Sequence, residues 1–235
     1  MCNGSIMDKL ISFSLPLMVS GILQLAFNAV DIIVVGRFSG SQALAAVGST
    51  TALINVFTNL FIGISLGANV LAARFYAAGK DREMSETVHT SITLALISGI
   101  MMAVIGVLLA KWALEIMGTP DDVIGQSALY MRIYFMGMPF FMLYNYGAAI
   151  LRAIGDTKRP LIFLIISGIA NAALNMILVI LFHMGVAGVA IGTIISQLIS
   201  CVLVLTCLYR SEGSYQLRFS KLKINGAYME QIFQV

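Results

Sequence analysis

The stretch LPLMVSGILQLAFNAVDIIVVGRF, residues 15–38, is almost wholly apolar, yet it carries a carboxyl group near its C-terminal end. About 20 consecutive apolar residues suffice for an α-helix to cross the roughly 30 Å hydrocarbon core of a membrane. Asp31 is the only acidic residue in any long apolar run of this chain. Placing a carboxyl group at membrane depth costs roughly 2.5–3.5 kcal/mol, so such residues usually face a cavity and serve function. Asp31 is therefore the first candidate functional residue.

Further apolar runs of similar length follow along the chain. The composition, 59% hydrophobic and 11% charged with a mean hydropathy of +0.94, excludes an ordinary soluble domain. We predict an all-α polytopic membrane protein with a six-helix transmembrane lobe over residues 1–209. Its expected spans are about 10–35, 44–73, 88–110, 125–150, 160–182 and 186–209.

The basic residues indicate how this bundle is oriented. If the N-terminus is cytoplasmic, most Lys and Arg residues fall in cytoplasmic segments, and only Arg37, Lys111 and Arg132 fall on the opposite side. This bias predicts a multi-pass protein with both termini in the cytoplasm. The net charge of +3 then reports topology, and we expect no nucleic-acid partner. Residues 210–235 turn polar and then amphipathic, which predicts a cytoplasmic connector toward a second lobe.

Polar side chains recur at helical spacing inside the spans, so they share helix faces. Polar groups facing lipid would lack partners, so these faces should line the bundle interior or a cavity. The topology brings most of them to the outer half of the bundle. We predict a substrate cavity lined by Gln24, Asn28, Asn55, Asn59, Tyr130, Tyr134, Tyr144 and Gln197.

Three uses are open for the Asp31 carboxylate in such a cavity. A carboxylate shielded from water can take up and release a proton, and with neutral oxygen ligands it can hold a hard cation such as Na⁺. A cationic substrate is the third, helped by tyrosine faces. The alternative is an acid near the outer interface that only reaches toward water. A single asparagine can equally form a hydrogen bond between helices instead of binding a ligand, and a single tyrosine can serve only in packing or as an anchor at the membrane interface.

Two prolines lie inside predicted spans. Pro16 and Pro139 each remove one backbone hydrogen bond, so each predicts either a fixed bend or a working hinge. His89 and His183 fall at opposite membrane faces, and no catalytic constellation or Walker-type loop is present in the sequence. We expect neither an enzyme nor a bound cofactor.

Three segments resemble the multidrug and toxic compound extrusion (MATE) family: residues 15–48 (LPLMVSGILQLAFNAVDIIVVGRFSGSQALAAVG), 151–161 (LRAIGDTKRPL) and 171–197 (NAALNMILVILFHMGVAGVAIGTIISQ). The resemblance implies a bacterial plasma-membrane antiporter of two six-helix lobes that exports organic cations and other drugs in exchange for Na⁺ or H⁺. The family's first-helix acid corresponds to Asp31, its fifth-helix polar pair to Asn171 and Asn175, and a sixth-helix hydroxyl to Thr193. These four residues are the predicted ion-coupling group.

Two departures from the family pattern qualify this prediction. Many bacterial members have an acid where this chain has Asn175, which leaves Asp31 as the sole charge. Only one lobe is present, so the partner would be a second six-helix lobe or a second copy of the chain. The alternatives are a truncated, non-transporting membrane subunit or fragment, and a related lipid-linked oligosaccharide flippase. A flippase would need more cationic side chains in the cavity, and the polar faces carry none.

Overall fold

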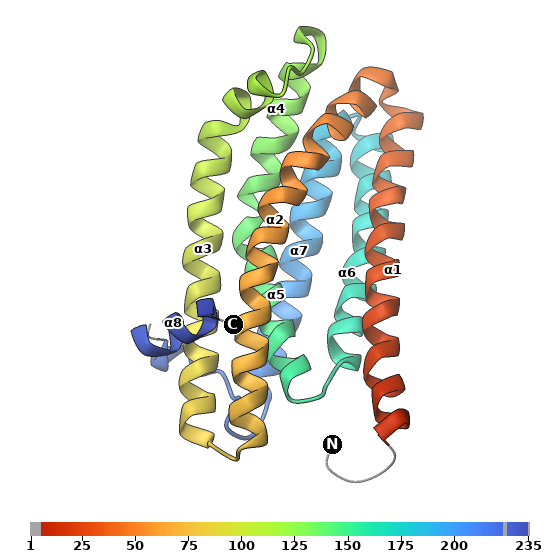
Figure 1. Cartoon of the computed structure of the whole chain (residues 1–235). Helices are drawn as coiled ribbons and strands as arrows, with labels where there is room; N and C mark the ends of the chain where they lie inside the picture. Colours follow the sequence, from red (N-terminus) through yellow and green to blue (C-terminus); the bar gives the residue numbers. More distant parts are fainter. Residues whose placement is uncertain (1–5, 223–224, 235) are drawn as a thin grey trace.

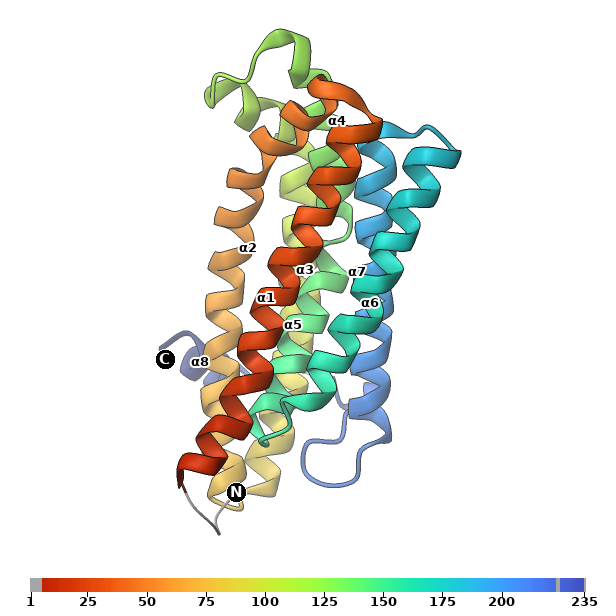
Figure 2. The same ribbon diagram turned by 90° about the vertical axis from the view of Figure 1, so that its right-hand side faces the viewer.

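The computed structural model describes residues 6–222 and 225–234, and this part of the chain is a bundle of long helices without strands (Figure 1). Connections at one end of the bundle alternate with connections at the other, and the N-terminal end of the first helix lies at the same end as the α2–α3 and α5–α6 loops (Figures 1 and 2). The helices are α1 (Ile6–Phe38), α2 (Gly40–Ala77), α3 (Asp81–Ile116), α4 (Asp121–Met136), α5 (Met138–Ala153), α6 (Lys158–Met176), the π-helical turn η1 (Ile177–Leu181), α7 (Gly185–Arg210), the 3₁₀ turn η2 (Phe219–Lys221) and α8 (Gly226–Gln234).

Five stretches in the described residues are long and apolar enough to cross a membrane: α1 from Leu10, α2, α3, α6 with η1, and α7. They correspond to five of the six predicted spans. The remaining span, 125–150, is two shorter helices, α4 and α5, that lie end to end (Figure 1). Together they complete the six-helix bundle.

The break between α4 and α5 falls at Gly137, where the chain approaches α7 closely. A Cβ atom added to Gly137 would lie 2.7 Å from Gln197 Oε1 and 2.9 Å from Ile194 Cγ1, so only glycine fits without a shift. Pro139 directly follows this break in the first turn of α5. Pro139 lies within the 125–150 span, but at the start of a helix and not inside one. At a helix start the missing proline N–H leaves no internal hydrogen bond broken.

Small residues on α3 allow it to pack closely against α4 and α5. Gly99 of α3 lies against the backbone of Pro139, and Gly106 of α3 lies against the ring of Phe135. The Phe135 ring also meets Phe57 of α2 edge to face, with ring centroids 5.9 Å apart. Without a hydrophobic driving force between helices in lipid, such close backbone approach is a main source of association. These contacts fix the position of the helices that flank the site.

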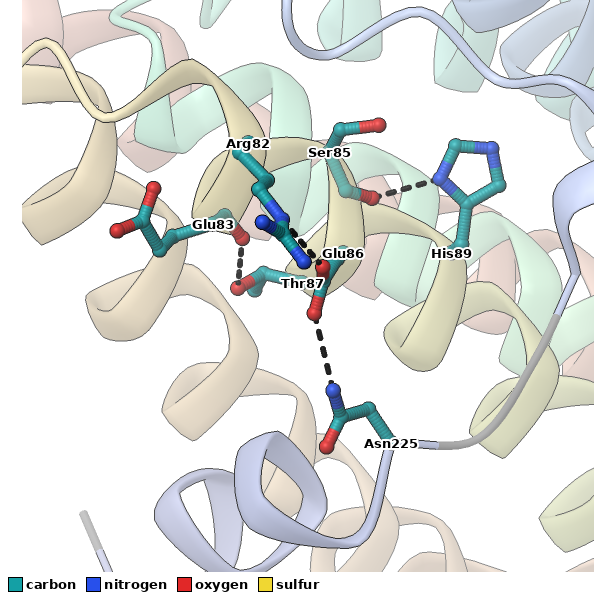
Figure 3. A network of polar contacts seen from close by, with 7 residues as sticks. All are labelled: Arg82, Glu83, Ser85, Glu86, Thr87, His89 and Asn225. Carbon is teal, nitrogen blue, oxygen red and sulfur yellow. Dashed lines mark hydrogen bonds and ion pairs between the residues drawn. The ribbon is translucent and has the colours of Figure 1, made fainter.

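The chain after α7 folds back onto the bundle, and α8 lies across α2 and α3 (Figure 1). His89 of α3 is buried; its Nδ1 lies 2.6 Å from Ser85 O, and its Nε2 accepts the Arg218 backbone N–H at 3.1 Å. Asn225 Nδ2 donates to Glu86 Oε2 at 2.9 Å (Figure 3). The described part of the predicted connector is thus held against the lobe. Residues 1–5, 223–224 and 235 of the two predicted units lie outside the described residues.

Candidate functional site

A cavity of about 430 Å³ lies between α1, α2, α4, α5, α6 and α7. Ligand sites for drug-sized molecules typically have volumes of roughly 300–1,000 Å³. The wall combines amides, hydroxyls and tyrosine rings with few aliphatic side chains. The structure brings together in this wall all eight predicted cavity residues, Gln24, Asn28, Asn55, Asn59, Tyr130, Tyr134, Tyr144 and Gln197, and also Asp31, Asn171 and Thr193.

Asp31 is joined to α6 and α7 by a chain of hydrogen bonds. Asn175 Nδ2 donates to Asp31 Oδ1 at 2.5 Å and lies 3.3 Å from Asn171 Oδ1. Asn171 Nδ2 in turn donates to Thr193 Oγ1 at 3.4 Å. The four residues come from three helices, and Asn175 is fully buried behind the cavity wall. This geometry favours an acid held by partners over one that only reaches toward water.

Asn175 fits here because α7 presents no side chain opposite it. A Cβ at Gly192 would collide with Asn175 Oδ1. That oxygen is buried and accepts no hydrogen bond among the described residues. The π-helical turn η1 begins two residues further on, and π turns often occur at functional sites. One carboxylate with neutral amide and hydroxyl oxygens suits a proton or a monovalent hard cation better than a divalent metal.

The tyrosines divide between the two ends of the cavity. The rings of Tyr130 and Tyr134, both on α4, have centroids 6.1 Å apart at a tilt of 33°. Tyr144 lies on α5, and its hydroxyl donates to Pro160 O at 3.1 Å near the start of α6. Flat apolar faces with a hydroxyl edge suit aromatic and cationic organic molecules.

One side of the cavity is exposed in this chain. Gln24 and Asn28 on α1 and Asn55 and Asn59 on α2 line the cavity but are themselves exposed. Polar groups at membrane depth need partners, so this side requires either water or another protein surface.

Pro16 lies in the interior of α1, as predicted, and its side chain is buried. Ser20 Oγ donates to Pro16 O at 2.8 Å, one turn above the missing proline hydrogen bond. The helix continues through this point to Phe38, so Pro16 and Asp31 are carried by one continuous element.

Arg152 lines the cavity but is not among the residues that the sequence predicts there. It lies in the last turn of α5, lines the cavity, and is its only cationic lining residue, as Asp31 is its only acidic one. The expectation that the cavity carries no cation is therefore wrong. A signal was present, because Phe141, Asn145 and Arg152 follow one helical face. The basic residues Lys158 and Arg159 that follow it predict instead a position at the cytoplasmic surface.

Comparisons with known proteins agree with this architecture. The MatE family model matches residues 16–177. The probable multidrug resistance protein YoeA of Bacillus subtilis is 35% identical over 213 residues, 89% of this chain and 46% of its own length. The multidrug export protein MepA of Staphylococcus haemolyticus is 27% identical over 237 residues, 99% of this chain and 52% of its own length.

The fold is that of solved MATE structures. A MATE crystal structure in the bent conformation superposes with a TM-score of 0.91 at 22% identity, covering 99% of this chain and 52% of that one. The chain thus spans about half the length of the relatives and structures it matches, as one lobe of their fold.

Proposed function

Because this chain belongs to the MatE family of multidrug and toxic compound extrusion transporters, we propose that it is the N-terminal lobe of a secondary active multidrug exporter. Its substrates are organic cations and other drugs, moved in exchange for Na⁺ or H⁺. The observation that carries the proposal is the linked group Asp31, Asn175, Asn171 and Thr193 beside a tyrosine-bearing cavity.

In this proposal Asp31 is the ion-coupling carboxylate. Asn175 donates to it, and the hydrogen-bond chain continues through Asn171 to Thr193, whose oxygens would be the further ligands of an ion that Asp31 binds. If ion and substrate both require the Asp31 charge, their binding is mutually exclusive, and exchange of one for the other gives antiport. Secondary transporters of this kind rock two repeats around a midplane site. A second lobe, or a second copy, would therefore close the exposed side of the cavity, and Pro16 would allow α1 to bend.

The proposed setting is the bacterial plasma membrane with both termini in the cytoplasm. Arg74 in the last turn of α2, Lys80 in the α2–α3 loop, and Lys158 and Arg159 in the first turn of α6 lie at the same end of the bundle as the start of α1 (Figure 1). The positive-inside rule assigns that end to the cytoplasm. The Asp31 group then lies toward the outer side.

The test is ion-driven export of a fluorescent organic cation from proteoliposomes that contain this chain, with Na⁺ and pH gradients applied separately. Asp31→Asn should reduce export to the level of protein-free vesicles under whichever gradient drives the unmodified chain. Asp121→Asn, an exposed acid in the first turn of α4, is the matched control and should leave export unchanged. Intact ion-driven export in Asp31→Asn would refute the coupling role.

The same preparation addresses the alternative of a non-transporting fragment. Crosslinking in detergent should yield a dimer if a second copy completes the site. A monomer that neither binds nor exports the cation would support the fragment instead.

A further inference from the structure

Arg152 and Asp31 lie at opposite ends of one cavity. Arg152 is in the last turn of α5, beside the loop that leads into Lys158, and the Tyr144 hydroxyl reaches Pro160 at that same end. Asp31 contacts Asn175 on α6. At 1.5 Å per residue, Asn175 lies about 25 Å along α6 from Lys158, the first residue of that helix. The cavity is therefore electrically polarised along the bundle axis, with a carboxylate at one end and a guanidinium at the other.

The two charges differ in what already holds them. Asp31 accepts a hydrogen bond from Asn175. Arg152 makes no ion pair with any acid of the described residues, and its Nε atom is buried without a hydrogen-bond partner among them. A guanidinium nitrogen that is buried without a hydrogen-bond partner is costly, because its lost hydration is not replaced. A partner supplied by a ligand would remove that cost.

The chemistry around Arg152 selects the kind of ligand. A guanidinium presents a planar set of N–H donors that matches a carboxylate or a phosphate group with two parallel hydrogen bonds. Tyr144 on α5 is an electrostatic neighbour of Arg152, and the lining of this cavity includes no carboxylate besides Asp31, at the other end, that would compete for the guanidinium. The site is built for an anionic group at the end of an otherwise neutral or aromatic body.

We propose that Arg152 forms an anion subsite at the end of the cavity opposite Asp31, which binds the carboxylate or phosphate of a zwitterionic or anionic amphipathic ligand. This inference rests on the proposed function, in which the cavity is a ligand site, and it widens the substrate class beyond organic cations. The anionic group has two sources, a free organic anion or the headgroup of a phospholipid that enters from the exposed side between α1 and α2.

The test uses the full chain in nanodiscs and two dyes that differ in one charge: rhodamine B, whose carboxylate is free, and rhodamine B ethyl ester, in which it is masked. Equilibrium binding is followed by fluorescence polarisation without any ion gradient. The unmodified chain should prefer rhodamine B. Arg152→Gln should weaken rhodamine B binding about tenfold or more, as expected for loss of a charge-assisted pair, and should change ester binding less than about twofold.

Further arms keep the test decisive. If Arg152→Gln does not give a monodisperse protein, Arg152→Lys decides, because it keeps the charge but loses the paired geometry and should lower rhodamine B affinity alone. No preference for rhodamine B in the unmodified chain, or an equal loss of both dyes in either variant, would overturn the subsite. Equal loss would mean that Arg152 holds the protein together through a partner of its own.

The lipid composition distinguishes the two sources of the anion. Nanodiscs of phosphatidylcholine are compared with nanodiscs that also contain phosphatidylglycerol. Competition by phosphatidylglycerol in the unmodified chain, absent in Arg152→Gln, identifies a lipid headgroup; no competition identifies a free organic anion. Because no gradient is used, a failure here is separate from a failure of ion coupling in Asp31→Asn.

Discussion

The two ends of the cavity are built differently. The Asp31 end is tied into three helices by hydrogen bonds through Asn175, Asn171 and Thr193. The Arg152 end has a charge that no described residue pairs. Partners that are already present hold a group in place and stabilise the fold, whereas a group without them contributes through what it binds. Substitutions at the first end should therefore affect stability, and substitutions at the second should affect binding.

The largest effect is expected for Asn175→Ala. Among the described residues Asn175 is the only side-chain donor to Asp31, and its truncation also leaves a void at a fully buried position. Hydrogen bonds to charged groups contribute about 1.5–3 kcal/mol, so the free energy of unfolding should fall by at least that much. Thermal unfolding in detergent measures it. Asn171→Ala is the matched variant and should cost less, because Asn171 donates only to a neutral hydroxyl at 3.4 Å; the reverse order would contradict this account.

Gly192→Ala should lower the free energy of unfolding nearly as much as Asn175→Ala. The added Cβ would collide with Asn175 Oδ1, and overpacking of a filled site typically costs about 1–3 kcal/mol. Gly63→Ala is the control, since Gly63 is an exposed helical glycine with no atom within 4 Å of its would-be Cβ. Equal thermal midpoints for the two variants would show that the Asp31 end is less tightly packed than described.

Arg152→Met should have little effect on stability. The substitution removes a charge without a described partner and retains an unbranched apolar stem, so we expect a change within about 0.5 kcal/mol or a slight gain. Thermal unfolding of the ligand-free protein measures this. A loss comparable to that of Asn175→Ala would mean that the two ends of the cavity are alike after all.

The smallest effect is expected far from the cavity. Arg82 pairs with Glu86 one turn away on α3 at 3.2 Å, with the Arg82 side chain 89% exposed. Exposed pairs of this spacing contribute about 0.3–0.5 kcal/mol, which salt screens. Arg82→Ala should thus shift the thermal midpoint only marginally and less still at high salt. It provides the baseline against which the cavity variants are judged.

Most of the bundle could be predicted from the sequence, because apolar length alone determines which segments can span a membrane. The polar residues of the cavity wall could be predicted for a related reason. Polar side chains such as those of Gln24, Asn55 and Tyr130 are unfavourable in lipid, so at membrane depth they are expected in a shared interior. The family resemblance added Thr193, which one-face periodicity does not distinguish from other helical hydroxyls.

What could not be predicted depends on tertiary contacts. The helix is interrupted at Gly137, where the chain closely approaches α7. A glycine in an apolar run does not indicate that another helix packs against it, so this interruption could not be predicted. Arg152 was assigned to the cytoplasmic surface because it adjoins a basic loop, but its long side chain reaches the cavity. The return of the connector onto α3 depends on contacts such as that of His89 with Arg218, which are far apart in sequence.

The interruption at Gly137 divides the fourth span into two helices, α4 and α5, joined by a single residue. A continuous helix resists bending through its unbroken ladder of hydrogen bonds, and that ladder is weakest where one helix stops and the next begins. Helix α4 carries Tyr130 and Tyr134, which lie at the Asp31 end of the cavity, and helix α5 carries Tyr144 and Arg152. A small rotation at Gly137 would change the spacing between Asp31 and Arg152 without unwinding α4 or α5, and the length of molecule that spans the two charges would change with it.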